Sequence, residues 1–153
     1  MKALELKVPP VVLVAIAAGG MWAASGISPN LHFAIPGVAL WSAGIAVVGI
    51  CIAILGVLQF RVAGTTVDPR VPGQSTNLVV NGVYRYSRNP MYLGFFLALC
   101  AWGLYLGSVI SLLILPVFIV YMTRFQIVPE ERFMHDQFGE LYDKYRSEVR
   151  RWL

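Results

Sequence analysis

The sequence predicts an all-α integral membrane protein with about four transmembrane helices and a C-terminal amphipathic helix in the cytoplasm. Hydrophobic residues make up 58% of the 153 residues and charged residues only 13%, whereas a soluble domain carries about 25% charged residues. The apolar residues form long uncharged runs, and the lysines and arginines are confined to the segments between them. We therefore expect residues 1–153 to form a single membrane domain with much of its surface in lipid.

The lengths of the apolar runs give the expected spans. A helix of about 20 apolar residues crosses a bilayer core of about 30 Å, and the first two runs match that length. The third run, residues 91–128, is nearly twice as long. Gly107-Ser108 offers a place for it to reverse direction, which predicts a tight helical hairpin. The expected spans are residues 8–25, 36–60, 90–106 and 108–128.

The positions of the basic residues predict the orientation. With four crossings, all twelve lysines and arginines fall on one side of the membrane. The positive-inside rule then places both termini and the loop 61–89 in the cytoplasm. Because the basic residues form no patch on a polar domain, nucleic-acid binding is excluded despite the net charge of +4. No spacing of histidine, cysteine or carboxylate residues indicates a metal site.

The N-terminus allows a second interpretation. Lys2, Lys7 and the following apolar stretch, which ends in Ala-Ala-Ser25, also fit a secretory signal peptide with a cleavage site. Glu5 and Pro9-Pro10 are untypical of such a peptide and favour a retained first span. Cleavage would leave three spans and the same cytoplasmic loops.

Small residues recur at steps of three and four along two of the spans, which predicts close helix packing in lipid. They are Ser42, Ala46, Gly49, Ala53 and Gly56 in the second span, and Gly94, Ala98 and Ala101 in the third.

The segment 129–150 is predicted to be one amphipathic helix. At about 100° per residue, Phe138, Tyr142 and Tyr145 share a face with Glu131 at its centre. Glu130 lies at the margin of this face. Pro129 at a helix start and acids in the first turn would by themselves stabilise the helix. A carboxylate on a buried stripe, however, also requires a cationic or donor partner.

The segment 81–94 leads from the loop into the third span. Arg85 and Arg88 can pair with carboxylates, and Asn89 offers both donors and an acceptor. Pro90 suits the start of a helix. Topology alone also explains the arginines, and the interfacial aromatic belt explains the tyrosines.

Two ordered motifs resemble the isoprenylcysteine carboxyl methyltransferase family and the related membrane phospholipid N-methyltransferases. The first is Gly82-Val-Tyr-Arg-Tyr-Ser-Arg-Asn-Pro-Met-Tyr-Leu-Gly94, and the second is Pro129-Glu-Glu followed by Phe138-Gly-x-x-Tyr142-x-x-Tyr145. The similarity runs from Arg61 to the C-terminus and includes Gly64-Thr-Thr-Val-Asp-Pro69. Many members have Arg-His-Pro where this chain has Arg88-Asn89-Pro90, so a histidine base cannot be assigned there.

The resemblance implies S-adenosylmethionine as the methyl donor, bound between the middle loop, the start of the third span and the last helix. Glu131, with Glu130, would bind its ammonium group, and Arg85 or Arg88 its carboxylate. Backbone groups near Tyr84, with Tyr92, would hold the nucleoside. The cofactor-binding residues that the resemblance implies are Gly82, Val83, Tyr84, Arg85, Arg88, Asn89, Pro90, Tyr92, Glu130 and Glu131.

The implied reaction is methyl transfer to a lipophilic small molecule or lipid at the cytoplasmic membrane face, with the acceptor entering from the bilayer. A carboxylate acceptor would need only an orienting cation such as Arg146, and an amine would need a base, either His135 or a glutamate. The catalytic candidates are therefore Glu131, Arg146 and His135. The alternatives are an NADPH-dependent membrane reductase of the sterol-reductase type and a non-catalytic membrane ligand-binding module.

Overall fold

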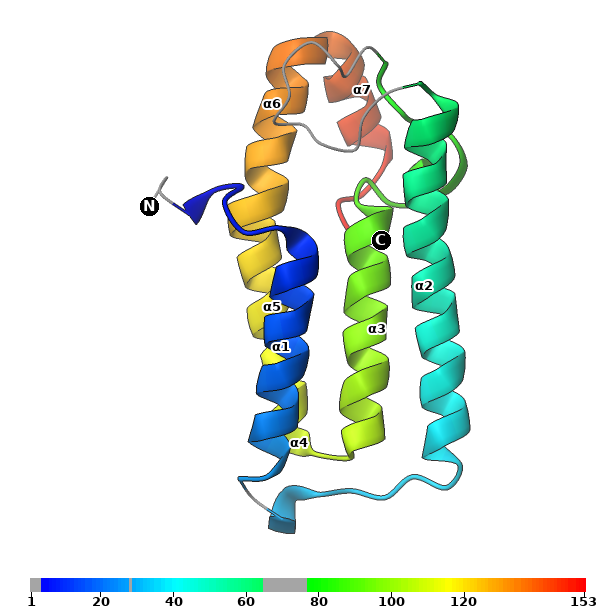
Figure 1. Cartoon of the computed structure of the whole chain (residues 1–153). Helices are drawn as coiled ribbons and strands as arrows, with labels where there is room; N and C mark the ends of the chain where they lie inside the picture. The colour runs from blue at the N-terminus through cyan, green and yellow to red at the C-terminus, as the bar shows by residue number, and fades with distance from the viewer. Residues whose placement is uncertain (1–3, 28, 65–76) are drawn as a thin grey trace.

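The computed structural model describes residues 4–27, 29–64 and 77–153, which form a bundle of helices (Figure 1). Lys2, Arg70 and most of the segment Gly64-Thr-Thr-Val-Asp-Pro69 lie outside the described residues. The helices are α1 (Pro10–Ser25), η2 (Pro29–Leu31), α2 (Val38–Val62), η3 (Gly82–Arg85), α3 (Pro90–Leu106), α4 (Val109–Leu112), α5 (Ile114–Met122), η4 (Thr123–Ile127), α6 (Val128–Phe138) and α7 (Glu140–Glu148). The described part of the chain contains no strand, which confirms the all-α class.

Two helices are long and apolar enough to cross a membrane. They are Val38–Val62, with a mean hydropathy of 2.5, and the continuous helix Val109–Phe138, with 1.8. The apolar helices α1 and α3 are shorter, at 16 and 17 residues. Large apolar side chains such as Leu40, Trp41 and Val120 are exposed on the bundle. An exposed apolar surface of this kind suits contact with lipid.

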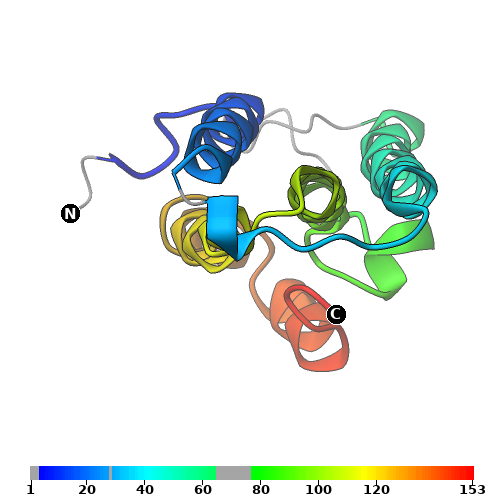
Figure 2. The same cartoon turned by 90° about the horizontal axis from the view of Figure 1, so that it is seen from below.

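Helix α3 occupies the middle of the bundle, between α2 on one side and the α1–α5 pair on the other (Figure 2). It ends at Gly107, whose φ of 61° permits the reversal into α4. The side chain of Ser108 caps α4 by accepting a hydrogen bond from Ser111 N. The main core lies among α1, α3 and α5 and contains Ala17, Met21, Tyr92, Leu99, Phe118, Met122 and Ile127.

Helices α2 and α3 approach closely through their small residues, as the stripe of such residues predicts. Ser42, Gly49 and Gly56 are the buried residues of α2. A Cβ atom on Gly94 would lie only 2.4 Å from the backbone oxygen of Gly49. The backbones therefore meet at a distance that only glycine allows.

Replacing Gly94 by alanine should destabilise the protein by about 1–3 kcal/mol, because backbone atoms cannot move aside as a flexible side chain does. Gly44 is the matched control, since a Cβ atom there meets nothing within 4 Å. Thermal unfolding in detergent measures both variants. Equal melting temperatures for Gly94→Ala and Gly44→Ala would contradict this account of the contact.

The C-terminal region differs from the expected single helix over 129–150. The helix does not start at residue 129, because α6 continues η4 without interruption. It stops at Phe138, where Gly139 takes φ 52° and ψ −126°, a conformation that only glycine adopts readily. Glu131 and Tyr142 therefore lie on two helices, and the expected shared face does not exist.

Candidate functional site

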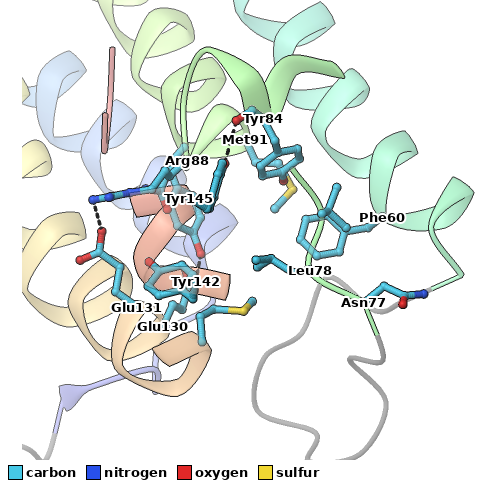
Figure 3. Close-up of a pocket in the computed structure, with 14 residues that line it drawn as sticks. Phe60, Asn77, Leu78, Tyr84, Arg88, Met91, Glu130, Glu131, Tyr142 and Tyr145 are labelled. Carbon is cyan, nitrogen blue, oxygen red and sulfur yellow. Dashed lines mark hydrogen bonds and ion pairs between the residues drawn. The ribbon is translucent and has the colours of Figure 1, made fainter. Parts of the chain in front are cut away.

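A pocket lies at the end of the bundle where α2, η3, α3, α6 and α7 meet (Figure 3). Each of these elements contributes side chains, and the chain reversal at Gly139 brings α7 back over it. The residues that line it are Phe60, Asn77, Leu78, Val79, Tyr84, Arg88, Asn89, Met91, Tyr92, Glu130, Glu131, Met134, Tyr142 and Tyr145.

Glu131 is held by two arginines. Arg88 Nη2 donates to Glu131 Oε1 at 2.8 Å, and Arg151 donates from Nε and Nη2 to both carboxylate oxygens at 2.9 and 2.7 Å. The side chains of Glu131 and Arg88 are only 12% and 9% exposed. Hydrogen bonding to Glu131 raises the pKa of Arg151. Both oxygens of Glu131 are thus engaged by charge-assisted hydrogen bonds.

The chain end is fixed against the start of α3. The backbone N–H of Arg88 donates to Arg150 O at 3.0 Å, and its Nη1 donates to Arg146 O at 2.9 Å. Asn89 Nδ2 donates to Arg151 O at 2.9 Å. These bonds place the guanidinium of Arg151 beside Glu131. In Figure 3 the dashed line between Arg88 and Glu131 marks the centre of this network.

One tyrosine bonds the second acid, Glu130, and Tyr84 and Tyr145 line the pocket with it. Tyr92 donates its hydroxyl to Glu130 Oε1 at 2.5 Å. The hydroxyl of Tyr84 is buried and has no hydrogen-bond partner among the described residues. Burial raises the pKa of Tyr84, with smaller contributions from Tyr145 and the negative charge of Glu130. Tyr145 donates to the backbone oxygen of Tyr84 at 2.7 Å (Figure 3).

The pocket contains a second buried donor without a partner in the described part of the chain, the Nε of Arg88. A buried polar atom that makes no hydrogen bond is costly, so such atoms in native proteins usually face water or a ligand. Phe60 packs edge-on against the ring of Tyr84, with ring centres 5.4 Å apart, and forms an apolar wall beside these donors. The residues that line the pocket therefore include two acids, two buried donors without a partner among the described residues, and an aromatic surface.

Six of the expected site residues line this pocket. They are Tyr84, Arg88, Asn89, Tyr92, Glu130 and Glu131.

The other expected residues lie elsewhere. Arg85 is exposed and does not line the pocket, whereas Arg88 does. His135 is about half exposed and lies 3.1 Å from Asp143 Oδ1, outside the pocket. Arg146 is exposed, does not line the pocket and accepts a hydrogen bond from Arg88 through its backbone oxygen. Three further expected residues do not line it either: Gly82, Val83 and Pro90.

The motifs did not reveal Arg151, which binds Glu131 from beyond the last helix. In the sequence it is one of several basic residues near the C-terminus, and no periodic pattern includes it. Met134 and Phe60 also line the pocket without belonging to either motif. These three residues are identified only by their positions in the folded structure.

An apolar groove of about 440 Å³ runs between α2 and α3, within the size range of small-molecule sites. Its outer rim includes Ile50 and Ile54, whose side chains are exposed. Among the described residues, Arg61 is the one charged residue that lines it. Met91 lines both the groove and the pocket, so the two spaces are neighbours.

Comparison with known proteins identifies the family of the chain. Residues 37–141 match the phospholipid methyltransferase family. The chain is 43% identical over 63 residues, 41% of its length, to the whole of an uncharacterized protein from Haemophilus influenzae. It is also 33% identical over 72 residues, 47% of its length, to a protein-S-isoprenylcysteine O-methyltransferase from Schizosaccharomyces pombe, and the match spans 30% of that protein. The chain belongs to the phospholipid methyltransferase family, as the resemblance to membrane methyltransferases predicts.

Proposed function

We propose that the protein transfers a methyl group from S-adenosylmethionine to a lipophilic acceptor at the cytoplasmic membrane face. The main support is a pocket lined by Glu130 and by two residues, Tyr84 and Arg88, that each carry a buried donor without a partner among the described residues. An apolar groove lies next to this pocket. Family membership supplies the reaction class. The polar pocket suits the cofactor, and the groove between α2 and α3 suits an acceptor that arrives from the bilayer.

The side chains of the pocket fit the cofactor's charged groups. Because both oxygens of Glu131 already bind arginines, we assign the ammonium group to Glu130 and a supporting role to Glu131. The unpaired Nε of Arg88 suits the cofactor's carboxylate. The Tyr84 hydroxyl and the ring of Phe60 suit the nucleoside. When bound, the cofactor supplies a methyl group that is activated by its positive sulfur.

The acid–base groups of the pocket favour a carboxylate acceptor. An amine must lose a proton before it attacks, and His135 lies outside the pocket in contact with Asp143. A carboxylate is already ionised at neutral pH and needs only to be positioned. Tyr142 is not a base at this pH either, because burial raises its pKa to about 12.

We also propose four membrane crossings, with α1 and α3 as the short ones. The described connections 26–27, 29–37 and 107–108 at one end of the bundle contain no lysine or arginine. Arg61, Arg88 and Arg124 lie towards the other end, where the pocket is found. The positive-inside rule places that end in the cytoplasm, together with both termini.

Membranes that contain the protein should incorporate label from methyl-labelled S-adenosylmethionine into extractable lipid. A carboxylate acceptor would form a methyl ester, from which mild base releases labelled methanol, whereas an N-methyl group resists base. Membranes with the Glu130→Gln variant are the control. If wild-type protein binds the cofactor but labels no lipid, the non-catalytic ligand-binding module becomes the better account. Tight binding of NADPH instead would favour the reductase.

A further inference from the structure

A proline lies within the long helix just before the two acids. Pro129 has no N–H, so it cannot bond to the carbonyl of Phe125 four residues earlier, and its ring crowds that carbonyl. The helix accommodates the proline through the π-turn η4, in which Val128 N–H bonds to Thr123 O. A π-turn inserts one extra residue, which rotates the following residues by about 100°. The directions of the acids at 130 and 131 therefore depend on this turn.

The segment before α1 forms hydrogen bonds with the π-turn, including one to a backbone carbonyl that the proline leaves without its helical donor. Leu6 N–H donates to the carbonyl of Phe125 at 3.0 Å, in place of the missing proline donor. Leu6 makes this bond with a φ of 56°, a strained value for a residue other than glycine. Gln126, buried within the turn, donates from Nε2 to Val8 O at 2.7 Å. Figure 1 shows this segment beside the helix that continues into α6.

Glu5 connects the π-turn to the helix α6 that follows it. Its carboxylate pairs with Arg124 at 3.3 Å and also with Arg132. In a regular α-helix, residues eight apart point about 80° away from each other, but one inserted residue brings them almost into line. Burial raises the pKa of Glu5, but hydrogen bonds and charge from Arg132 and Arg124 outweigh it and lower the pKa. The inserted residue of the π-turn thus brings both arginines to the same side of the helix, where the single carboxylate of Glu5 pairs with each of them.

We infer that residues 4–8 form an N-terminal clasp that sets the rotation of α6 and thereby positions Glu130 and Glu131 in the pocket. This inference rests on the proposed function, because it assigns the clasp to the cofactor-binding acids. The clasp residues do not line the pocket. Their role is therefore one of positioning, exerted through Phe125, Arg124 and Arg132.

The variant Glu5→Gln tests the clasp in the whole chain of 153 residues, purified in detergent. Asp136→Asn is the matched control, because Asp136 is exposed on α6 and makes no ion pair among the described residues. Hydrogen exchange should become faster in residues 123–138 and stay unchanged in Val38–Val62. Calorimetry should show the affinity for S-adenosylmethionine falling roughly tenfold, as the loss of two partly exposed ion pairs allows.

Unchanged hydrogen exchange in Glu5→Gln would overturn the clasp. Faster exchange with unchanged affinity would overturn its positioning role. If wild-type protein fails to bind the cofactor, the proposed function fails, and hydrogen exchange still decides whether the clasp exists.

Pro129→Ala gives an independent test of the rotation. Alanine restores the N–H at this position, so the helix can bond to Phe125 O without the π-turn. We expect a higher melting temperature, because the helix gains a backbone hydrogen bond. We also expect weaker cofactor binding, because a regular helix would turn Glu130 away from the pocket. A purely structural role for the turn would give the higher melting temperature with unchanged affinity, and that result would overturn the inference.

Discussion

Replacing Arg88 by methionine will abolish cofactor binding and destabilise the protein by about 3 kcal/mol. This value is the lower end of the usual cost of removing one partner of a buried ion pair. Arg88 binds Glu131 at 2.8 Å and also donates to the backbone oxygen of Arg146. Its side chain is 9% exposed. Its removal leaves Glu131 with Arg151 alone and deletes one of the hydrogen bonds that hold the C-terminal segment against the start of α3.

Arg85→Met is the matched control for this prediction. It removes the same charge from the same motif, but Arg85 is exposed and lies outside the pocket. Thermal unfolding and calorimetric titration with S-adenosylmethionine measure the two effects separately. Equal losses in both variants would show that the net charge of the segment matters rather than the Arg88–Glu131 pair.

Changing Glu130 to glutamine will weaken cofactor binding by about 10- to 100-fold, the equivalent of a hydrogen bond to a charged group. Its folding should be nearly unaffected, because the amide oxygen can still accept from Tyr92. Glu131→Gln should behave differently. That change removes the negative charge between Arg88 and Arg151 and leaves two cations close together. We expect its main effect to be a lower melting temperature.

The contrast between the two glutamates separates cofactor binding from support of the pocket. Calorimetry at a temperature where both variants are folded gives the affinities, and thermal unfolding gives the stabilities. If a stable Glu131→Gln variant shows a large loss of affinity for S-adenosylmethionine, then Glu131 rather than Glu130 binds the ammonium group of the cofactor. No loss in Glu130→Gln would remove Glu130 from the proposed site.

Local patterns predict the helical class and most of the helix positions. The apolar runs are long because a lipid-facing helix must be apolar on its outer surface as well. The reversal at Gly107 and the close contact of Gly49 with Gly94 both occur at positions where the sequence has glycine, which lacks a Cβ atom. The two motifs also indicate which segments meet at the site, although they do not distinguish Arg85 from Arg88.

The roles within the site depend on the tertiary structure. Helical periodicity places Glu131 and Tyr142 on one face only if the helix is continuous, and Gly139 breaks it. The π-turn shifts the phase of α6 by one residue, and its bonds come from Leu6, more than a hundred residues away in the sequence. Arg151 reaches Glu131 only because the chain end folds back onto α3. The sequence by itself determined an apolar helical bundle and the two segments that form its polar end. Only the folded chain decided which side chains meet there, because a one-residue change in helix phase or a single glycine turn redirects every residue that follows.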